Sequence, residues 1–395
     1  MTPAHSRPGY FAIAARPGAI PELDGLRGIA ILLVLLRHAA RPIHAEHGGI
    51  LQVGSWDIAV PLLNGWMGVD LFFVLSGFLI THHLLMRWPE RLGAGFLLRY
   101  WLKRVLRTFP AYYATLFIVA AGVLPFYRPQ VADLTGEVAH HVIFLQDYLG
   151  SELVPAFWSL GVEEKFYLLC PFILWWLGAY PRMRQIRILT ALALLPLLLR
   201  AMTMALNAGV VVDYASFFWT VRSPFHLALD GLWLGVMCAL ACRWRPAALT
   251  GDAANRHRLL FAGIALVALL QSAVAWFDAG HFRASVIVLA LVPVGFAAIV
   301  LAVTSGTTAA SRVLRTRWLR FLAVTSYSVY LTHMLMVPVA EGLVGSVEAF
   351  SQASPPVQFL LFLPVFVALS LVAGLALHLA VEKPFLLLKD RVQLH

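Results

Sequence analysis

The sequence contains few charged residues for its length. Only 13% of its 395 residues are charged, whereas soluble domains average about a quarter. Hydrophobic residues make up 60% of the chain and form long runs, for example at 188–199, 259–270 and 286–303. Runs of about 20 apolar residues are long enough to cross a bilayer as a helix. Several such runs in one chain exclude a soluble globular fold and predict an all-α, polytopic membrane protein.

Cysteine is scarce, and a cleavable signal peptide is not recognisable. The three cysteines, Cys170, Cys238 and Cys242, lie in or beside apolar runs without paired metal-ligand spacing, so we expect no disulfide. Residues 1–20 contain arginines but no uninterrupted apolar core, so we expect the first span to remain as an anchor. We find no internal repeat and no low-complexity segment.

Ten segments are apolar enough to predict about ten transmembrane helices. They cover residues 28–44, 61–86, 108–126, 157–179, 186–205, 224–242, 259–277, 284–304, 318–340 and 357–380. An even number of spans places both termini on one side of the membrane. Residues 127–156 form the longest outer connection, which we expect to be an interfacial or re-entrant segment.

The basic residues separate the two sides of the predicted membrane domain. Both tails, four of the loops and the span-edge residues Arg27 and Arg320 hold 23 of the 30 Lys and Arg residues. The four loops are 87–107, 180–187, 243–258 and 305–317. Basic loops stay in the cytoplasm, so both termini are predicted to be cytoplasmic. The net charge of +10 therefore reflects topology, and we expect no nucleic-acid partner.

Ionisable side chains are concentrated in some of the predicted spans and nearly missing from the seventh, eighth and tenth. Such groups are costly in a membrane and usually mark function, which predicts a ring of helices around a polar cavity. Arg27 and His38 lie about 16 Å apart along one helix. With Arg27 at the cytoplasmic edge, His38 lies near mid-membrane. There its imidazole either accepts a proton in a cavity or hydrogen-bonds to a neighbouring helix.

Six motifs then occur in a fixed order along the chain. They are P-E-L-D-G-L-R-G-I-A-I-L-L-V-L-L-R-H at 21–38, G-V-D-L-F-F-V-L-S-G-F-L-I at 68–80, R-Y-W-L-K-R-V-L-R at 99–107, F-W-S-L-G-V-E-E-K-F-Y-L at 157–168, S-Y-S-V-Y-L-T-H at 326–333 and V-E-K-P-F at 381–385. Together they resemble the membrane-bound acyltransferase-3 family of O-acyltransferases. Arg37 beside His38, and Lys165 after Glu164, depart from the family pattern and alter the charge expected in the pocket.

The resemblance implies an enzyme that transfers an acyl group, commonly acetyl, from cytoplasmic acyl-CoA to a hydroxyl of a sugar or glycan. It further implies a multi-pass protein of the plasma (bacterial inner) membrane and no permanently bound cofactor. The chain is then divided into a cytoplasmic N-terminal tail (1–20), an acyltransferase-3-like membrane domain (21–389) and a cytoplasmic C-terminal tail (390–395). The acyl group, the acceptor and the oligomeric state stay open.

The donor site is predicted from basic and aromatic residues. Lys103, Arg104 and Arg107 lie near one another on a helix and, with Arg27, suit the phosphates of CoA. Anchoring of the cytoplasmic side explains any single one of these basic residues equally well. Tyr327 and Tyr330 share a helix face with His333 and are expected to contact the donor arm or the acceptor. An interfacial aromatic belt explains the two tyrosines about as well.

The catalytic residues are predicted to be His38, Glu163 and Asp70. The resemblance makes His38 the essential histidine, acting as general base or through a transient acyl-histidine. Asp70, Glu163 and Glu164 are the candidates for an acidic partner that orients the ring of His38. Asp70 and Glu163 could also pair with Arg37 or Arg27 to neutralise buried charge, alone or alongside that role. His333, Ser159 and Glu164 are expected to bind the substrate.

We predict no metal, because the pairs His82/His83 and His140/His141 lack the spacing of a zinc site. A transporter or flippase of glycans is the main alternative function, since it also needs polar residues within its spans. A non-catalytic sensor is a second alternative, although it would not need the basic element and the intramembrane histidine together.

Overall fold

The computed structural model describes residues 20–54, 56–244, 252–273, 282–304 and 306–392. Most of the predicted N-terminal tail (1–20) and the end of the C-terminal tail (390–395) lie outside these residues. The described part is almost entirely helical, which confirms the predicted all-α class. The only strands in it are the short antiparallel pair β1 (Gln52–Val53) and β2 (Trp56–Asp57).

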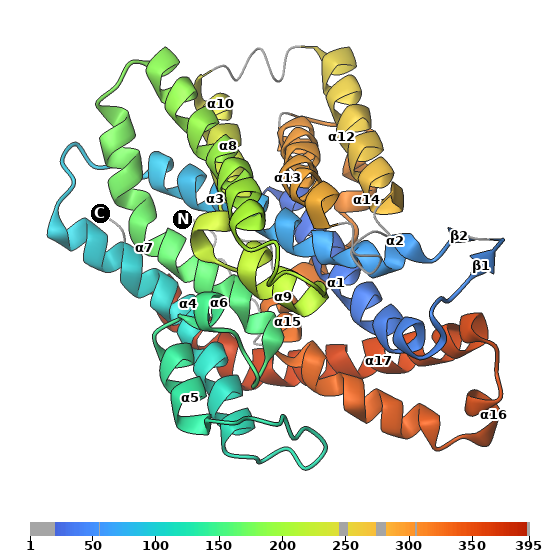
Figure 1. The fold of residues 1–395 in the computed structure, drawn as a ribbon. Coiled ribbons are helices and arrows are strands. Elements are labelled where there is room, and N and C mark those ends of the chain that lie inside the picture. The colour runs from blue at the N-terminus through green and yellow to red at the C-terminus, as the bar shows by residue number, and fades with distance from the viewer. Residues whose placement is uncertain (1–19, 55, 245–251, 274–281, 305, 393–395) are drawn as a thin grey trace, which may run out of the picture.

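Each of the ten predicted spans overlaps one long helix of the structure, although the bounds differ (Figure 1). These helices are α1 (Pro21–His47), α3 (Met67–Met86), α4 (Ala94–Ala120), α7 (Trp158–Gly178), α8 (Arg182–Leu206), α10 (Asp230–Trp244), α12 (Ala253–Ala273), α13 (Phe282–Thr304), α15 (Arg317–Gly345) and α17 (Pro355–Leu377).

Short helices connect or extend these elements. They are α2 (Val60–Leu63), η1 (Asn64–Trp66), α5 (Leu134–Val142), α6 (Gln146–Leu149), η2 (Pro155–Phe157), α9 (Tyr214–Phe217), the π-helical η3 (Phe218–Arg222), η4 (Phe225–Leu227), α14 (Ser311–Leu314), α16 (Glu348–Ser351), the π-helical η6 (His378–Glu382) and α18 (Lys383–Asp390).

Six stretches of helix in the described residues are long and apolar enough to cross a membrane. They are Val60–Met86, Arg182–Leu206, Ala253–Ser272, Phe282–Thr304, Arg317–Gly345 and Pro355–Asp390. The other four predicted spans fall on α1, α4 and α7, which carry several charged side chains, and on α10, which has only 15 residues.

Helices α1 and α3 lie at the centre of the structure. Helix α1 packs on α3, α15 and α17, and α3 packs on α10, α13 and α7. Glycine permits the closest of these approaches, because a Cβ on Gly77 of α3 would lie 2.1 Å from the carbonyl oxygen of Leu232 in α10. Gly235 of α10 faces α3 in the same way, 2.2 Å from the carbonyl of Val74. Small residues at such contacts are typical of helices that pack in a membrane.

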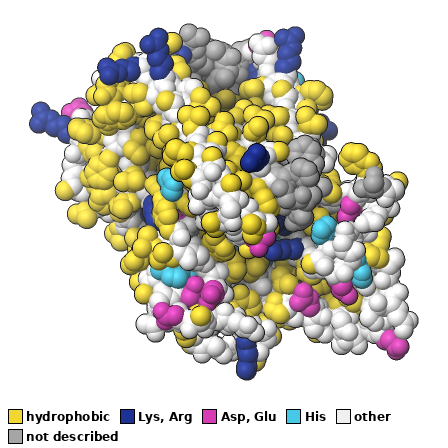
Figure 2. All heavy atoms as spheres, in the orientation of Figure 1, with side chains coloured by type: hydrophobic (Ala, Val, Ile, Leu, Met, Phe, Trp, Pro, Cys, Tyr) yellow, Lys and Arg dark blue, Asp and Glu magenta, His cyan; other side chains and the backbone are white. Residues whose placement is uncertain are grey.

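Helices α8, α12 and α17 lie at the periphery and expose most of their apolar surface. On α8, for example, Leu194, Leu198 and Leu206 are exposed. Figure 2 shows hydrophobic side chains over much of one face, with Lys and Arg gathered along its upper edge. An apolar exterior of this extent indicates contact with lipid rather than water.

Buried charges within the helical core are paired across elements. Arg200 of α8 donates two hydrogen bonds to the carboxylate of Asp230 in α10, at 2.7 and 3.1 Å. Arg222 of η3 makes the same two-pronged contact with Asp70 of α3, at 3.0 and 2.8 Å. Paired, charge-assisted hydrogen bonds of this geometry are strong, so these contacts fix α8 to α10 and η3 to α3.

Candidate functional site

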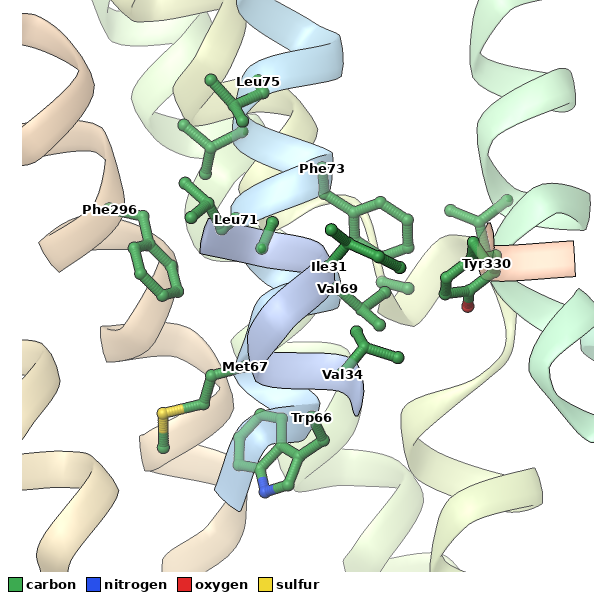
Figure 3. Close-up of a cluster of buried hydrophobic side chains, with 14 of the residues drawn as sticks. Ile31, Val34, Trp66, Met67, Val69, Leu71, Phe73, Leu75, Phe296 and Tyr330 are labelled. Carbon is green, nitrogen blue, oxygen red and sulfur yellow. The ribbon is translucent and has the colours of Figure 1, made fainter. Parts of the chain in front are cut away.

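Two cavities occupy the region where the sequence predicts the site. The larger has a volume of about 630 Å³ and the smaller about 250 Å³. Val69 of α3 and Tyr330 of α15 line both cavities. Figure 3 shows the Val69 side chain pointing toward Tyr330. The two cavities therefore adjoin at these two side chains, between α3 and α15, and we call this place the constriction.

Helix α1 passes both cavities and contributes one predicted site residue to each. Arg27 lines the larger cavity and His38 the smaller. The helical rise places these residues about 16 Å apart, as the sequence predicts. The Arg27 guanidinium donates a hydrogen bond to Ser326 of α15 at 3.1 Å, which holds it against the cavity wall.

His38 faces a second imidazole. The ring centroids of His38 and His333 are 4.8 Å apart, in an edge-to-face arrangement. Nδ1 of His333 lies 2.7 Å from the carbonyl oxygen of Tyr330 and donates to it. In the neutral ring this leaves Nε2 as an acceptor, and that atom is buried without a partner. Neither nitrogen of His38 has a hydrogen-bonding partner among the described residues. Both rings therefore offer nitrogen atoms to a ligand in the smaller cavity.

The face of α15 that the sequence predicted to contribute to the site lines both cavities. Tyr327 lines the larger cavity, Tyr330 lines both, and His333 lines the smaller. The Tyr330 hydroxyl donates to the carbonyl of Ala156 at 2.8 Å and lies 2.7 Å from the hydroxyl of Ser159. These bonds fix Tyr330 at the constriction. Tyr327 donates a hydrogen bond to the carbonyl of Thr108 in α4 at 2.7 Å, which joins α15 to α4.

The predicted basic residues gather at the larger cavity. Lys103, Arg104 and Arg107 of α4 line it together with Arg27. The Arg104 guanidinium lies over the rings of Tyr100 and Tyr167, 6.0 and 5.8 Å from their centroids. Such cation–π contacts orient the side chain without neutralising its charge. The larger cavity thus has a positively charged wall.

The acidic candidates occupy different environments, and none forms a hydrogen bond with His38 in the described structure. Glu163 lines the larger cavity and accepts a hydrogen bond from Ser76 at 2.5 Å. Asp70 pairs with Arg222 rather than with Arg37 or Arg27. Glu164 is not among the lining residues of either cavity.

Several residues that the sequence did not single out complete the smaller cavity. Tyr214, Trp66, Trp158 and Arg222 line it. The Arg222 guanidinium lies 4.8 Å from the ring centroid of Trp66 and 5.4 Å from that of Trp158. Tyr214 and Arg222 belong to short helices between two predicted spans, and no periodic pattern marks those residues.

Comparison with known proteins matches residues 20–375 to a family defined by an acyltransferase domain. The chain belongs to the acyltransferase-3 family. This confirms the resemblance drawn from the six motifs. No solved structure matches the chain.

Relatives in this family include O-acetyltransferases of three bacteria. The chain is 26% identical over 345 residues to a putative peptidoglycan O-acetyltransferase of Bacillus subtilis, covering 82% of this chain and 50% of the relative. It is 29% identical over 165 residues to a peptidoglycan O-acetyltransferase of Listeria monocytogenes, covering 38% and 24%. A putative O-acetyltransferase of Staphylococcus aureus is 25% identical over 342 residues, covering 80% and 50%. The chain spans about half the length of the relatives that it matches most fully.

A histidine cluster between α4 and α7 of this acyltransferase-3 protein lies outside both cavities. Potential ligand atoms of Glu137, His140 and His141 lie within 4.8 Å of one another, although sequence spacing alone does not suggest a metal site. Both nitrogens of His141 are already engaged, Nδ1 by the carbonyl of Glu137 at 2.7 Å and Nε2 by the hydroxyl of Ser151 at 2.9 Å. The hydrogen bonds give His141 a structural role.

His141 makes stability depend on pH. Burial disfavours its charged form and lowers its pKa from 6.5 to about 4, against the raising effect of the hydrogen bond to Glu137. Between these values the unfolded chain binds a proton that the folded chain does not, so stability falls as pH falls from 6.5 to 4. The loss is on the order of 3 kcal/mol.

We expect His141→Gln to remove this part of the pH dependence. Melting temperature in detergent, measured from pH 4 to pH 7, gives the comparison with wild type. The exposed His257, replaced by Gln, serves as the control and should leave the profile unchanged. Identical slopes for wild type and His141→Gln would contradict the assignment.

Proposed function

We propose that this protein is an integral-membrane O-acyltransferase. It moves an acyl group, acetyl in the simplest case, from cytoplasmic acyl-CoA to a hydroxyl of a cell-envelope glycan on the outer side. The observation that carries the proposal is the meeting of two cavities at Val69 and Tyr330. One cavity has basic walls for the donor, and the other contains His38 for the chemistry.

The proposed topology has ten transmembrane helices around these cavities, with both termini in the cytoplasm. Support comes from the ten long helices and from the 23 of 30 basic residues on one set of loops and tails. Residues 21–389 then form the membrane domain, between the tails 1–20 and 390–395. The bacterial inner membrane is the proposed location, since acyl-CoA is supplied from the cytoplasm.

The donor enters the larger cavity from the cytoplasmic side in this proposal. Arg27, Lys103, Arg104 and Arg107 bind its phosphates, because guanidinium groups hold phosphate oxygens through paired, charge-assisted hydrogen bonds. The narrow pantetheine arm passes the constriction beside Tyr330. The thioester then lies near His38 in the smaller cavity.

His38 acts as general base in the transfer. Its free ring nitrogen takes the proton of the acceptor hydroxyl as that oxygen attacks the thioester carbonyl carbon. The carbon–sulfur bond then breaks, and the CoA sulfur leaves with the electron pair. His38 passes the proton from the acceptor hydroxyl to this sulfur. The products are the O-acyl ester and free CoA. Transfer through an acyl-histidine gives the same products in two steps.

The other site residues support His38 in this scheme. His333 offers its free Nε2 to the acceptor, and Ser159 holds Tyr330 at the constriction. Glu163 lies on the donor side of the constriction. Asp70 acts through Arg222, which lines the smaller cavity. The relatives named for peptidoglycan O-acetylation make acetyl and a cell-wall glycan the first donor group and acceptor to test.

Cysteine labelling tests the topology. The native cysteines Cys170 and Cys238 are buried, and the half-buried Cys242 is replaced by alanine, so single exposed cysteines give the signal. A membrane-impermeant maleimide should label Arg128→Cys and Ser346→Cys in intact cells, and Arg184→Cys and Asp252→Cys only after permeabilisation. One reversed result within the chain would break the ten-span arrangement.

Loss of the two motif arginines tests the donor site. Arg104→Ala with Arg107→Ala should weaken acyl-CoA binding more than tenfold, because each charge-assisted bond is worth roughly 1.5–3 kcal/mol. Calorimetry on the purified protein measures this. Arg182→Ala with Arg184→Ala removes the same charge outside the cavity and should bind normally. Unchanged affinity of the first double variant would assign its arginines to topology alone.

Replacement of His38 tests the chemistry. His38→Ala should lower turnover per folded molecule by roughly 10²–10⁴-fold, with acyl-CoA binding and melting temperature nearly intact. Release of free CoA with a glycan acceptor present is the measurement, and it also separates an enzyme from a transporter. His47→Ala, on the same helix but outside both cavities, is the matched control. Turnover of His38→Ala within a few-fold of wild type would refute the assignment.

A further inference from the structure

The smaller cavity has an excess of positive charge. Arg37, Arg41 and Arg222 line it beside His38 and His333, whereas no Asp or Glu is among its described lining residues. Charged groups at such sites are normally paired with an opposite charge. Because the described wall of this cavity has three arginines and no acid, it favours a negative charge from outside the protein.

Only one of these arginines has a carboxylate partner among the described residues. Arg222 is neutralised by Asp70 behind the cavity wall. Arg37 donates instead to neutral oxygens, the carbonyl of Leu63 and the hydroxyl of Tyr214, the latter at 3.0 Å. Arg41 lies over the Tyr214 ring, 5.6 Å from its centroid, and Arg37 lies 5.5 Å from the same centroid. Two positive charges thus share one aromatic ring, and no described residue supplies an anion to either of them.

The two arginines without a carboxylate partner among the described residues, Arg37 and Arg41, lie close to the proposed chemistry. Arg37 is adjacent to His38 on α1, and Arg41 lies one turn beyond Arg37 on the same face. Arg41 is exposed and Arg37 is half-buried, so the pair leads from His38 away from the larger cavity. A guanidinium carries five donors, and two hydrogen bonds leave Arg37 with donors for a ligand.

We propose that Arg37 and Arg41 bind an anionic group, a carboxylate or a phosphate, carried by the acceptor sugar. The inference rests on the proposed function and narrows its substrate class to acidic glycans. The anion occupies the outer part of the smaller cavity and brings a neighbouring hydroxyl to His38. A carboxylate at the far end of the acyl group is the other source of the same chemistry.

Binding measurements on the full-length protein in lipid nanodiscs test the site without relying on turnover. The probes are methyl glucoside, methyl glucuronide and methyl glucoside 6-phosphate, titrated by calorimetry. Wild type should bind at least one anionic sugar about tenfold or more tightly than the neutral one. Arg37→Gln with Arg41→Gln should remove the preference, and Arg37→Lys with Arg41→Lys should retain part of it.

The control removes the same charge elsewhere. Arg128→Gln with Arg283→Gln replaces two exposed arginines that line neither cavity, and it should keep the preference. Melting temperatures of all variants show that each is folded. Equal binding of neutral and anionic sugars by wild type, or a preference that survives in the Arg37/Arg41 glutamine variant, would overturn the proposal.

Turnover with two donors separates the sources of the anion. With acetyl-CoA, the acidic sugar should be the better acceptor through a lower KM. A preference that appears only as faster use of succinyl-CoA with the neutral sugar would overturn the acceptor assignment. Anion binding without any acyl transfer would refute the proposed function and leave the anion site standing. Acyl transfer without a charge preference would refute the anion site and leave the proposed function standing.

Discussion

The cost of burying charge among apolar helices is the constraint that organises this structure. An unpaired buried charge is strongly unfavourable, and the protein meets this cost by joining elements distant in sequence. Arg200 joins α8 to α10 through Asp230, and Arg222 joins η3 to α3 through Asp70. Lys165 of α7 binds Asp147 of α6 at 2.5 Å. Once these pairs are formed, one cavity stands out. The free nitrogens of His38 and His333 face it, together with Arg37 and Arg41, which have no carboxylate partner among the described residues.

The parts of the site that depend on helix geometry could be predicted from the sequence. Arg27 and His38 lie on one helix, so their separation follows from the rise per residue. The sequence predicts one polar cavity, whereas these two residues line two different cavities. The Tyr327, Tyr330 and His333 face is predictable for the same reason. The partner of Asp70 is not, because Arg222 lies 152 residues away and belongs to a short π-helical turn. Such a pairing depends on tertiary packing that no local pattern encodes.

The fold, like the site, has parts that the sequence predicts and parts that it does not. Long apolar runs predict helices because a helix that spans a bilayer needs about 20 predominantly apolar residues. The connections are harder, since short helices such as α9 and η4 are too brief for periodicity to appear. The sixth predicted span illustrates this limit: residues 224–242 read as one apolar segment, whereas α10 begins only at Asp230. The residues before it form η4.

The constriction at Val69 and Tyr330 affects whether ions can leak across the membrane through the protein. A water-filled path from one side of a membrane to the other would let ions through and dissipate the gradients that drive the cell. In the proposed orientation the two cavities approach each other from opposite sides, and an apolar valine and a tyrosine ring fixed by two hydrogen bonds lie between them. A hydrophobic neck excludes hydrated ions but accepts a thin, uncharged organic chain. In the proposed mechanism, the same narrow point that lets an acyl arm through also keeps the membrane insulating between turnovers.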